Sequence, residues 1–227
     1  MMARRGVLGM LAGGAAALLS ACNPFGGNSY RFRMTVEVET PEGLKRGASV
    51  YAVRAEKHSP TIFPEARGRS REVVGEAVAV EVSPGKALFA LMKTLNGAGD
   101  DNLAYLSMVT LDPAYKNDWV ESAQRISSGD DIRSSADVAE GDYPMLVMFT
   151  DIDDPTSVQR VDPANLAASF GPGIRLKRIT VEVTDDDVTT GIEKRLRWLE
   201  RLDNYSFHKD GPFYKNFPSE VMALRSK

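Results

Sequence analysis

The sequence predicts an α+β fold, with an antiparallel, β-rich N-terminal half and a mixed α/β C-terminal half. Apolar and polar residues alternate along several stretches of the first half, which is typical of half-buried strands. In the second half, apolar strand-like runs are separated by stretches with helical spacing. The chain has 227 residues, 43% of them apolar, so it can bury a substantial core.

The clearest strand of the first half is "YRFRMTVEVET", residues 30–40. Tyr30, Phe32 and every second residue after them are apolar, whereas the residues between them are charged or polar. Turn sequences, "PEG" and "SPG", then separate this strand from later ones. The predicted strands of this antiparallel unit are residues 30–40, 49–55, 73–82 and 86–93, the last being apolar enough to be covered on both faces.

The middle of the chain predicts one helix and a long polar loop. Asp112-Pro113 resembles an N-cap followed by proline at the first helical position, and apolar residues with helical spacing follow. We therefore expect a helix over residues 113–126. Residues 127–142 are polar and mark a possible domain boundary.

Residues 144–150 form an apolar run that predicts another strand. A short helix ending at Gly171 is expected next. The alternation in residues 174–184 changes phase, and a bulge near Lys177 would reconcile its two parts. Thr190 and Glu193 match a capping box, which predicts a helix over residues 191–202. The tail that follows is rich in aromatic residues and is expected to pack on the body.

The start of the chain reads as an export signal. Arg4 and Arg5 precede an uncharged run of about 14 residues, which is too short to span a bilayer as a helix. The run ends in "LSAC", and Cys22 is the only cysteine of the chain. This stretch resembles the lipobox of bacterial lipoproteins, which implies that Cys22 is lipidated and becomes the new N-terminus.

The resemblance implies a membrane-anchored protein of the cell envelope that faces the periplasm or the cell surface. By resemblance to the sorting rules of enterobacterial lipoproteins, Asn23 after the cysteine implies the outer membrane. The stretch "ARRGVLG" leaves both the general and the twin-arginine export routes open. Several acyl chains would hold the protein firmly to the membrane. The expected organisation is a signal peptide at 1–21, a tether at 22–29 and a body at 30–227, with possible units at 30–94, 95–143 and 144–227.

Charge limits the possible partners. Loss of the leader with its two arginines changes the formal net charge from −3 to −5. A mildly acidic body argues against nucleic-acid binding, which needs a basic face. The expected partners are the membrane, through Cys22, and an envelope protein or glycan.

Two acidic clusters are the first candidates for chemistry. Asp151, Asp153 and Asp154 follow one apolar strand, and residues 185–187 follow another. Alternating carboxylates at strand ends can bind calcium. However, an EF-hand loop starting at Asp151 would need glycine and glutamate where Thr156 and Asp162 stand. The sequence therefore favours turn residues over a metal site, and no cofactor is expected.

Local catalytic motifs are absent from the sequence. His58 lies in a polar loop and His208 in the aromatic tail, and no G-x-S-x-G, P-loop or H-E-x-x-H motif accompanies them. Residues 146–184 resemble a bacterial protein family of unassigned function, which implies no active site. The leading hypothesis is a non-enzymatic binding or structural protein of the envelope. The alternative is a periplasmic hydrolase whose site is assembled from dispersed residues.

Overall fold

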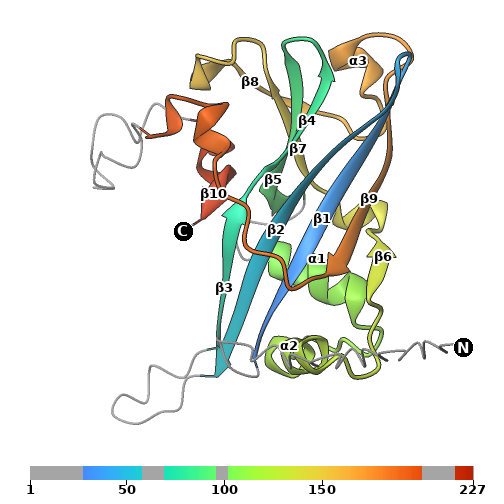
Figure 1. Cartoon of the computed structure of the whole chain (residues 1–227), viewed down its shortest axis with the longest axis vertical. Coiled ribbons are helices and arrows are strands. Elements are labelled where there is room, and N and C mark those ends of the chain that lie inside the picture. Colours follow the sequence, from blue (N-terminus) through green and yellow to red (C-terminus); the bar gives the residue numbers. More distant parts are fainter. Residues whose placement is uncertain (1–27, 58–68, 96–101, 201–217, 227) are drawn as a thin grey trace, which may run out of the picture.

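In the computed structural model of the chain, the described residues are 28–57, 69–95, 102–200 and 218–226. Within them, ten strands form two antiparallel sheets, and three short α-helices accompany them (Figure 1). The strands are β1 (Ser29–Thr40), β2 (Gly43–Lys57), β3 (Arg69–Glu76), β4 (Val78–Ser83), β5 (Lys86–Thr94), β6 (Ser135–Asp137), β7 (Pro144–Phe149), β8 (Val158–Val161), β9 (Arg175–Val183) and β10 (Arg225–Ser226). The helices are α1 (Asn102–Leu111), α2 (Trp119–Ser128) and α3 (Ala167–Phe170).

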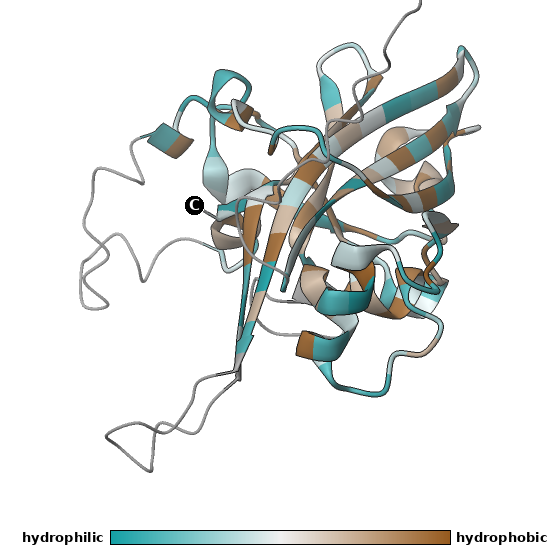
Figure 2. Ribbon diagram, turned by 60° about the horizontal axis from the view of Figure 1, so that its bottom comes forward, coloured by the Kyte–Doolittle hydropathy of each residue, from teal (hydrophilic) through white to brown (hydrophobic). Residues whose placement is uncertain are grey.

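The larger sheet has the strand order β10-β3-β2-β1-β9-β6 and the smaller one β4-β5-β7-β8. The predicted strand at residues 30–40 is confirmed as β1, which lies at the centre of the larger sheet. The alternation of apolar and charged residues in β1 determines which side chains face the core. Phe32 and Met34 are fully buried, whereas Arg31 and Arg33 lie on the outer face of the sheet. The same alternation is visible as teal and brown bands along the long strands (Figure 2).

The predicted strand over residues 73–82 is divided into two strands that belong to different sheets. β3 ends at Glu76 in the larger sheet, and β4 begins at Val78 in the smaller one. The cause lies at Gly75, whose φ of +153° favours glycine; a Cβ there would lie 2.5 Å from the Tyr51 ring. The pairing of β3 with β2 ends at Val74; Glu76 still pairs with Arg225 of β10, and the backbone N–H of Ala77 donates to the carbonyl of Leu224.

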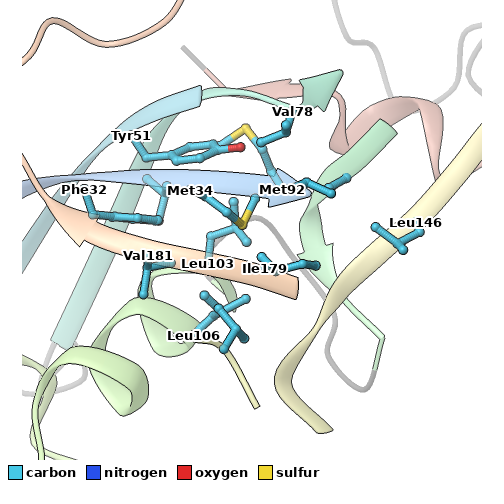
Figure 3. Close-up of a cluster of buried hydrophobic side chains, with 14 of the residues drawn as sticks. Phe32, Met34, Tyr51, Val78, Met92, Leu103, Leu106, Leu146, Ile179 and Val181 are labelled. Carbon is cyan, nitrogen blue, oxygen red and sulfur yellow. The ribbon is translucent and has the colours of Figure 1, made fainter. Parts of the chain in front are cut away.

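β5, in the smaller sheet, is buried on both faces, as predicted for residues 86–93. Leu88, Ala90 and Met92 of β5 join the central core, whereas Phe89 and Leu91 face a second cluster. The central core fills the space between the two sheets and α1 (Figure 3). The second cluster is covered by residues of the C-terminal segment, including Ile192, Leu196, Leu199, Val221 and Leu224.

The helix predicted over residues 113–126 begins later and has a helical neighbour that was not predicted. Asp112 caps only a turn, through the N–H of Ala114, because the chain then passes through Asn117 at φ +62°. Asp118 is the true N-cap of α2, and its side chain accepts hydrogen bonds from Val120 and Glu121. The preceding helix, α1, lies where the sequence predicted no regular structure.

The bulge predicted near Lys177 is confirmed. The pairing of β1 with β9 joins Glu37 to Arg178 and then Val38 to Leu176, which leaves Lys177 as the extra residue. The helix expected to end at Gly171 is confirmed as α3, with Gly171 at its C-cap.

The α+β prediction holds in its coarse form: the fold is β-rich, with two antiparallel sheets and few helices. Each sheet contains strands from both halves of the chain, since β1 pairs with β9 and β5 pairs with β7. None of the helices among the described residues has the length and hydropathy needed to cross a membrane.

Candidate functional site

Three residues singled out in the sequence lie outside the described residues. They are Cys22, His58 and His208. The expected lipidation of Cys22 therefore stays a prediction. The described residues include no histidine and no cysteine, so no candidate site among them contains either.

The carboxylates of Asp151, Asp153 and Asp154 lie in the turn between β7 and β8. Oδ1 of Asp151 accepts the N–H of Asp153 at 3.0 Å, and Oδ1 of Asp154 accepts the N–H of Thr156 at 2.8 Å. The Thr156 hydroxyl also donates to Asp154, and these bonds hold the pKa of Asp154 below its usual value. Within the described ranges, no group of three or more histidine, cysteine, aspartate or glutamate side chains is arranged to hold a metal ion.

The second acidic cluster holds a segment of chain against the larger sheet. Arg31 donates to the backbone carbonyls of Asp185 and Asp186 at 2.9 and 2.7 Å, and Arg33 pairs with the carboxylate of Asp186. The charged side chains of β1 therefore bind the chain as it leaves β9. We call residues 184–191 the crossing segment; Figure 1 shows it passing from β9 across the larger sheet.

The crossing segment ends beside an edge of β2 that β3 leaves open. β3 pairs with β2 only over Ala52–Lys57. Beyond that point Thr189 takes its place: its N–H donates to the carbonyl of Val50 at 3.1 Å, and its hydroxyl accepts the N–H of Val50 at 2.9 Å. The open edge is thus partly closed by a single residue rather than by a strand.

Glu76 fixes the other side of this opening. It is buried, and its Oε2 accepts the N–H of Ile192 at 2.8 Å. The expected capping box of Thr190 and Glu193 is therefore wrong: the turn begins after Gly191 without a side-chain cap, and the carboxylate of Glu76 from β3 accepts the N–H of Ile192. The helix predicted over residues 191–202 is not formed at its start: the described part has a 3₁₀ turn at Ile192–Lys194 and turns up to Trp198, and only Leu199 and Glu200 are helical, while residues 201–202 lie outside the described residues.

Two adjoining cavities of about 530 and 570 Å³ lie between these elements. Both are lined by Glu76, Thr189 and Thr190, so we treat them as one depression, the junction groove. Their remaining polar and charged lining consists of Ser49, Glu81, Lys194 and Arg195 in one cavity and Glu193, Glu200, Arg225 and Ser226 in the other.

The lining of each cavity contains one pair of opposite charges. Arg195 lies 3.6 Å from Glu81, and Arg225 lies 3.6 Å from Glu193. Lys194 and Arg195 line one of the two cavities and are the first of four basic residues, with Arg197 and Arg201, in this part of the sequence. Beneath the groove, burial, with a smaller contribution from Glu76, raises the pKa of the Tyr51 phenol far above its usual value, and this phenol stays protonated.

Several potentially reactive groups of the groove are already engaged in holding the fold. The Ser49 hydroxyl donates to the Ala77 carbonyl at 3.4 Å, Thr189 is bonded to Val50, and Glu76 is bonded to Ile192. The lining of the groove also contains carboxylate, guanidinium and ammonium groups, which can form hydrogen bonds with a ligand. That chemistry fits recognition of a polar chain better than activation of a nucleophile.

Sequence reasoning missed Glu76 and Thr189. One signal was present: Glu76 is a lone charged residue within the apolar stretch "VVGEAVAV". A charge in such a run is expected to have a buried partner. The partner, the backbone of Ile192, is 116 residues away along the chain and could not be deduced.

No family model matches the chain, and neither a curated protein nor a solved structure matches it.

Proposed function

We propose that this chain is a lipid-anchored envelope protein that binds a polar partner, an envelope protein or glycan, in the junction groove without catalysing a reaction. The anchor is the lipidated Cys22. Only six residues, Asn23–Asn28, separate it from β1, so Cys22 lies at most about 25 Å from Ser29. The body is thereby held close to the membrane, facing the periplasm or the cell surface.

The observation that carries the binding role is that the groove is held open by bonds independent of any ligand. Four segments distant in sequence meet there, and the bonds of Thr189 to Val50 and of Glu76 to Ile192 hold two of its walls. A preformed site loses little conformational entropy when a partner binds. Its mixed charges suit a partner with both donors and acceptors.

The anchor is tested by intact mass and membrane fractionation of wild type and Cys22→Ala. We expect the wild type to carry lipid and to sediment with membranes, and the variant to be unprocessed or released. A wild type that is soluble and unlipidated contradicts the anchor.

The groove is tested by a photo-crosslinking side chain placed at Thr190, with Gln159 as the control. Thr190 lines the groove, whereas Gln159 is exposed on the edge strand β8. We expect a discrete adduct at position 190 that is absent at 159 and lost in Lys194→Glu, which reverses a charge of the lining. Equal adducts at both positions, or none at 190, would contradict a partner in the groove.

The hydrolase alternative predicts a different outcome. A hydrolase would turn over small ester, amide or glycosidic substrates, and its activity would fall when Glu76 is replaced by glutamine. A binding protein shows no turnover in either form and loses only the adduct.

A further inference from the structure

A second polar cluster lies away from the groove, on the outer face of β1, β2 and β9. Its centre is Glu37, whose side chain is only 5% exposed although it points away from the central core. Three cations converge on this one carboxylate. Arg46 Nε lies 2.6 Å from Oε1, while Arg178 Nε and Lys177 Nζ lie 2.8 and 3.7 Å from Oε2.

The bulge in β9 makes this convergence possible. In a regular strand, adjacent side chains point to opposite faces, so Lys177 and Arg178 could not reach the same carboxylate. Lys177 is the extra residue of the bulge and shares the outer face with Arg178. Bulges commonly redirect a side chain next to a functional site.

The cluster carries more positive charge than its carboxylate can balance. Arg46, Lys177 and Arg178 retain side-chain exposures of 61%, 39% and 46%, respectively, so each also faces solvent. The hydrogen bond of Arg178 to Glu37 uses Nε, and its two terminal nitrogens have no acceptor among the described residues. The nearby Glu39 does not offset the surplus, because it pairs with Arg175.

Glu37 itself is held ionised. Burial acts to raise the pKa of Glu37, but hydrogen bonds and attraction from Arg178 and Arg46 outweigh it and lower the pKa below its usual value. One permanent negative charge therefore faces three positive ones. Two positive charges remain over this part of the sheet, in a chain whose formal net charge is −3.

We propose that Arg46, Lys177 and Arg178, the cation triad, bind a phosphate-type oxyanion over the outer face of the larger sheet. Glu37 orients the guanidinium groups through Nε and leaves their terminal N–H donors for the ligand. Planar guanidinium groups match the oxygens of a phosphate, and a lysine adds a point charge. The phosphate is either a free phosphate or a phosphomonoester on a glycan, or it is the phosphodiester of a lipid headgroup.

The test is an NMR titration of the full-length protein in a neutral detergent, read on the Arg178 Nε–Hε resonance. Inorganic phosphate represents the monoester and glycerophosphoglycerol the lipid diester, each against sodium chloride at equal ionic strength. We expect a saturable shift with at least one of the two phosphates and no shift with chloride. Tighter binding of inorganic phosphate indicates a free or glycan-borne phosphate as the ligand, and tighter binding of glycerophosphoglycerol indicates a lipid headgroup.

The variants test whether the triad is the site. Lys177→Gln and Arg46→Gln each remove one cation, and we expect at least about tenfold weaker binding from the loss of a charged hydrogen bond. Arg54→Gln is the matched control, because it removes an arginine from an exposed pair with Glu56 on the same sheet. It should change the affinity less than twofold.

The proposal is overturned if neither phosphate gives a saturable shift, or if chloride gives the same shift. It is also overturned if the control variant weakens binding as much as the triad variants. None of these outcomes bears on the junction groove, whose test reads a crosslinked adduct at position 190.

Discussion

The carboxylate of Asp112 holds together the turn between α1 and α2. Its side chain is 0% exposed, and its Oδ1 accepts the N–H of Ala114 at 2.9 Å. Arg125, one turn from the end of α2, donates to it through Nη2 at 2.6 Å. Burial acts to raise the pKa of Asp112, but the hydrogen bonds, above all those from Arg125, outweigh it and hold the pKa below its usual value.

We expect Asp112→Asn to lower the free energy of unfolding by about 2–4 kcal/mol, because it leaves Arg125 without its buried partner. A carboxyl with a lowered folded-state pKa stabilises the protein above its unfolded pKa and loses that effect as the pH falls through the folded value. The difference between wild type and variant should therefore be full at neutral pH and shrink below about pH 4. Urea unfolding at several pH values measures it.

Glu121→Gln is the control for this prediction. Glu121 pairs with the same Arg125 but is exposed, so its loss should cost at most about 1 kcal/mol. A cost for Asp112→Asn that is as small, or that stays unchanged from pH 7 to pH 3, would show that the pair does not stabilise the fold.

The sequence indicates that Asp112 is a capping residue, but it does not indicate which element Asp112 caps. Asp-Pro is typical of a helix start, and that local signal led to the wrong boundary at residue 113. The observed role depends on Arg125, which meets Asp112 only after α2 has begun at its own cap, Asp118. Local patterns identify a capping residue; the tertiary partner decides its role.

Strands with one buried face were the elements best predicted from the sequence. The alternation in β1 and the phase change in β9 each have one physical cause, a face against the core and a face against solvent. α1 could not be predicted in this way. Leu103, Ala104, Leu106, Met108 and Leu111 are all fully buried, so it has no polar stripe for a helical period to mark.

At the scale of one strand, the bulge in β9 predicts that one residue of the strand, Lys177, can be deleted without loss of the fold. Removing Lys177 restores a strict alternation from Ile174 to Val183, because the apolar residues on both sides of the bulge then share one parity. We therefore expect the deletion to retain the fold, at a cost below about 1 kcal/mol, while it abolishes the phosphate-dependent shift. Thermal unfolding and the NMR titration measure the two effects.

Deletion of Thr180 is the matched comparison. It places Ile179 directly before Val181, both fully buried, and turns one of them out of the core. A slip of this kind moves a whole face of a strand and should prevent stable folding. If the Lys177 deletion destabilises the protein as strongly, the bulge serves the fold rather than the cation triad.

Across the whole molecule, single strands connect the two hydrophobic clusters. Leu146 and Met148 of β7 belong to the central core, whereas Val147 and Phe149 belong to the second cluster. The chain also passes without a linker from β3 in one sheet to β4 in the other. Loss of packing in one hydrophobic cluster therefore disturbs strands that also contribute residues to the other cluster.

This arrangement predicts a single cooperative unfolding transition, and the two tryptophans of the chain can report it. Trp119 packs against the central core beneath Arg71, whereas Trp198 lies in the second cluster and donates to the carbonyl of Ile152 at 2.9 Å. In the single-tryptophan variants Trp119→Phe and Trp198→Phe, fluorescence and circular dichroism should give the same urea midpoint within each variant. If the fluorescence of Trp198 changes before the circular dichroism does, the C-terminal segment opens separately from the sheets. Since Ile192, Lys194 and Arg195 line the groove, such opening would make the groove a dynamic site rather than a preformed one.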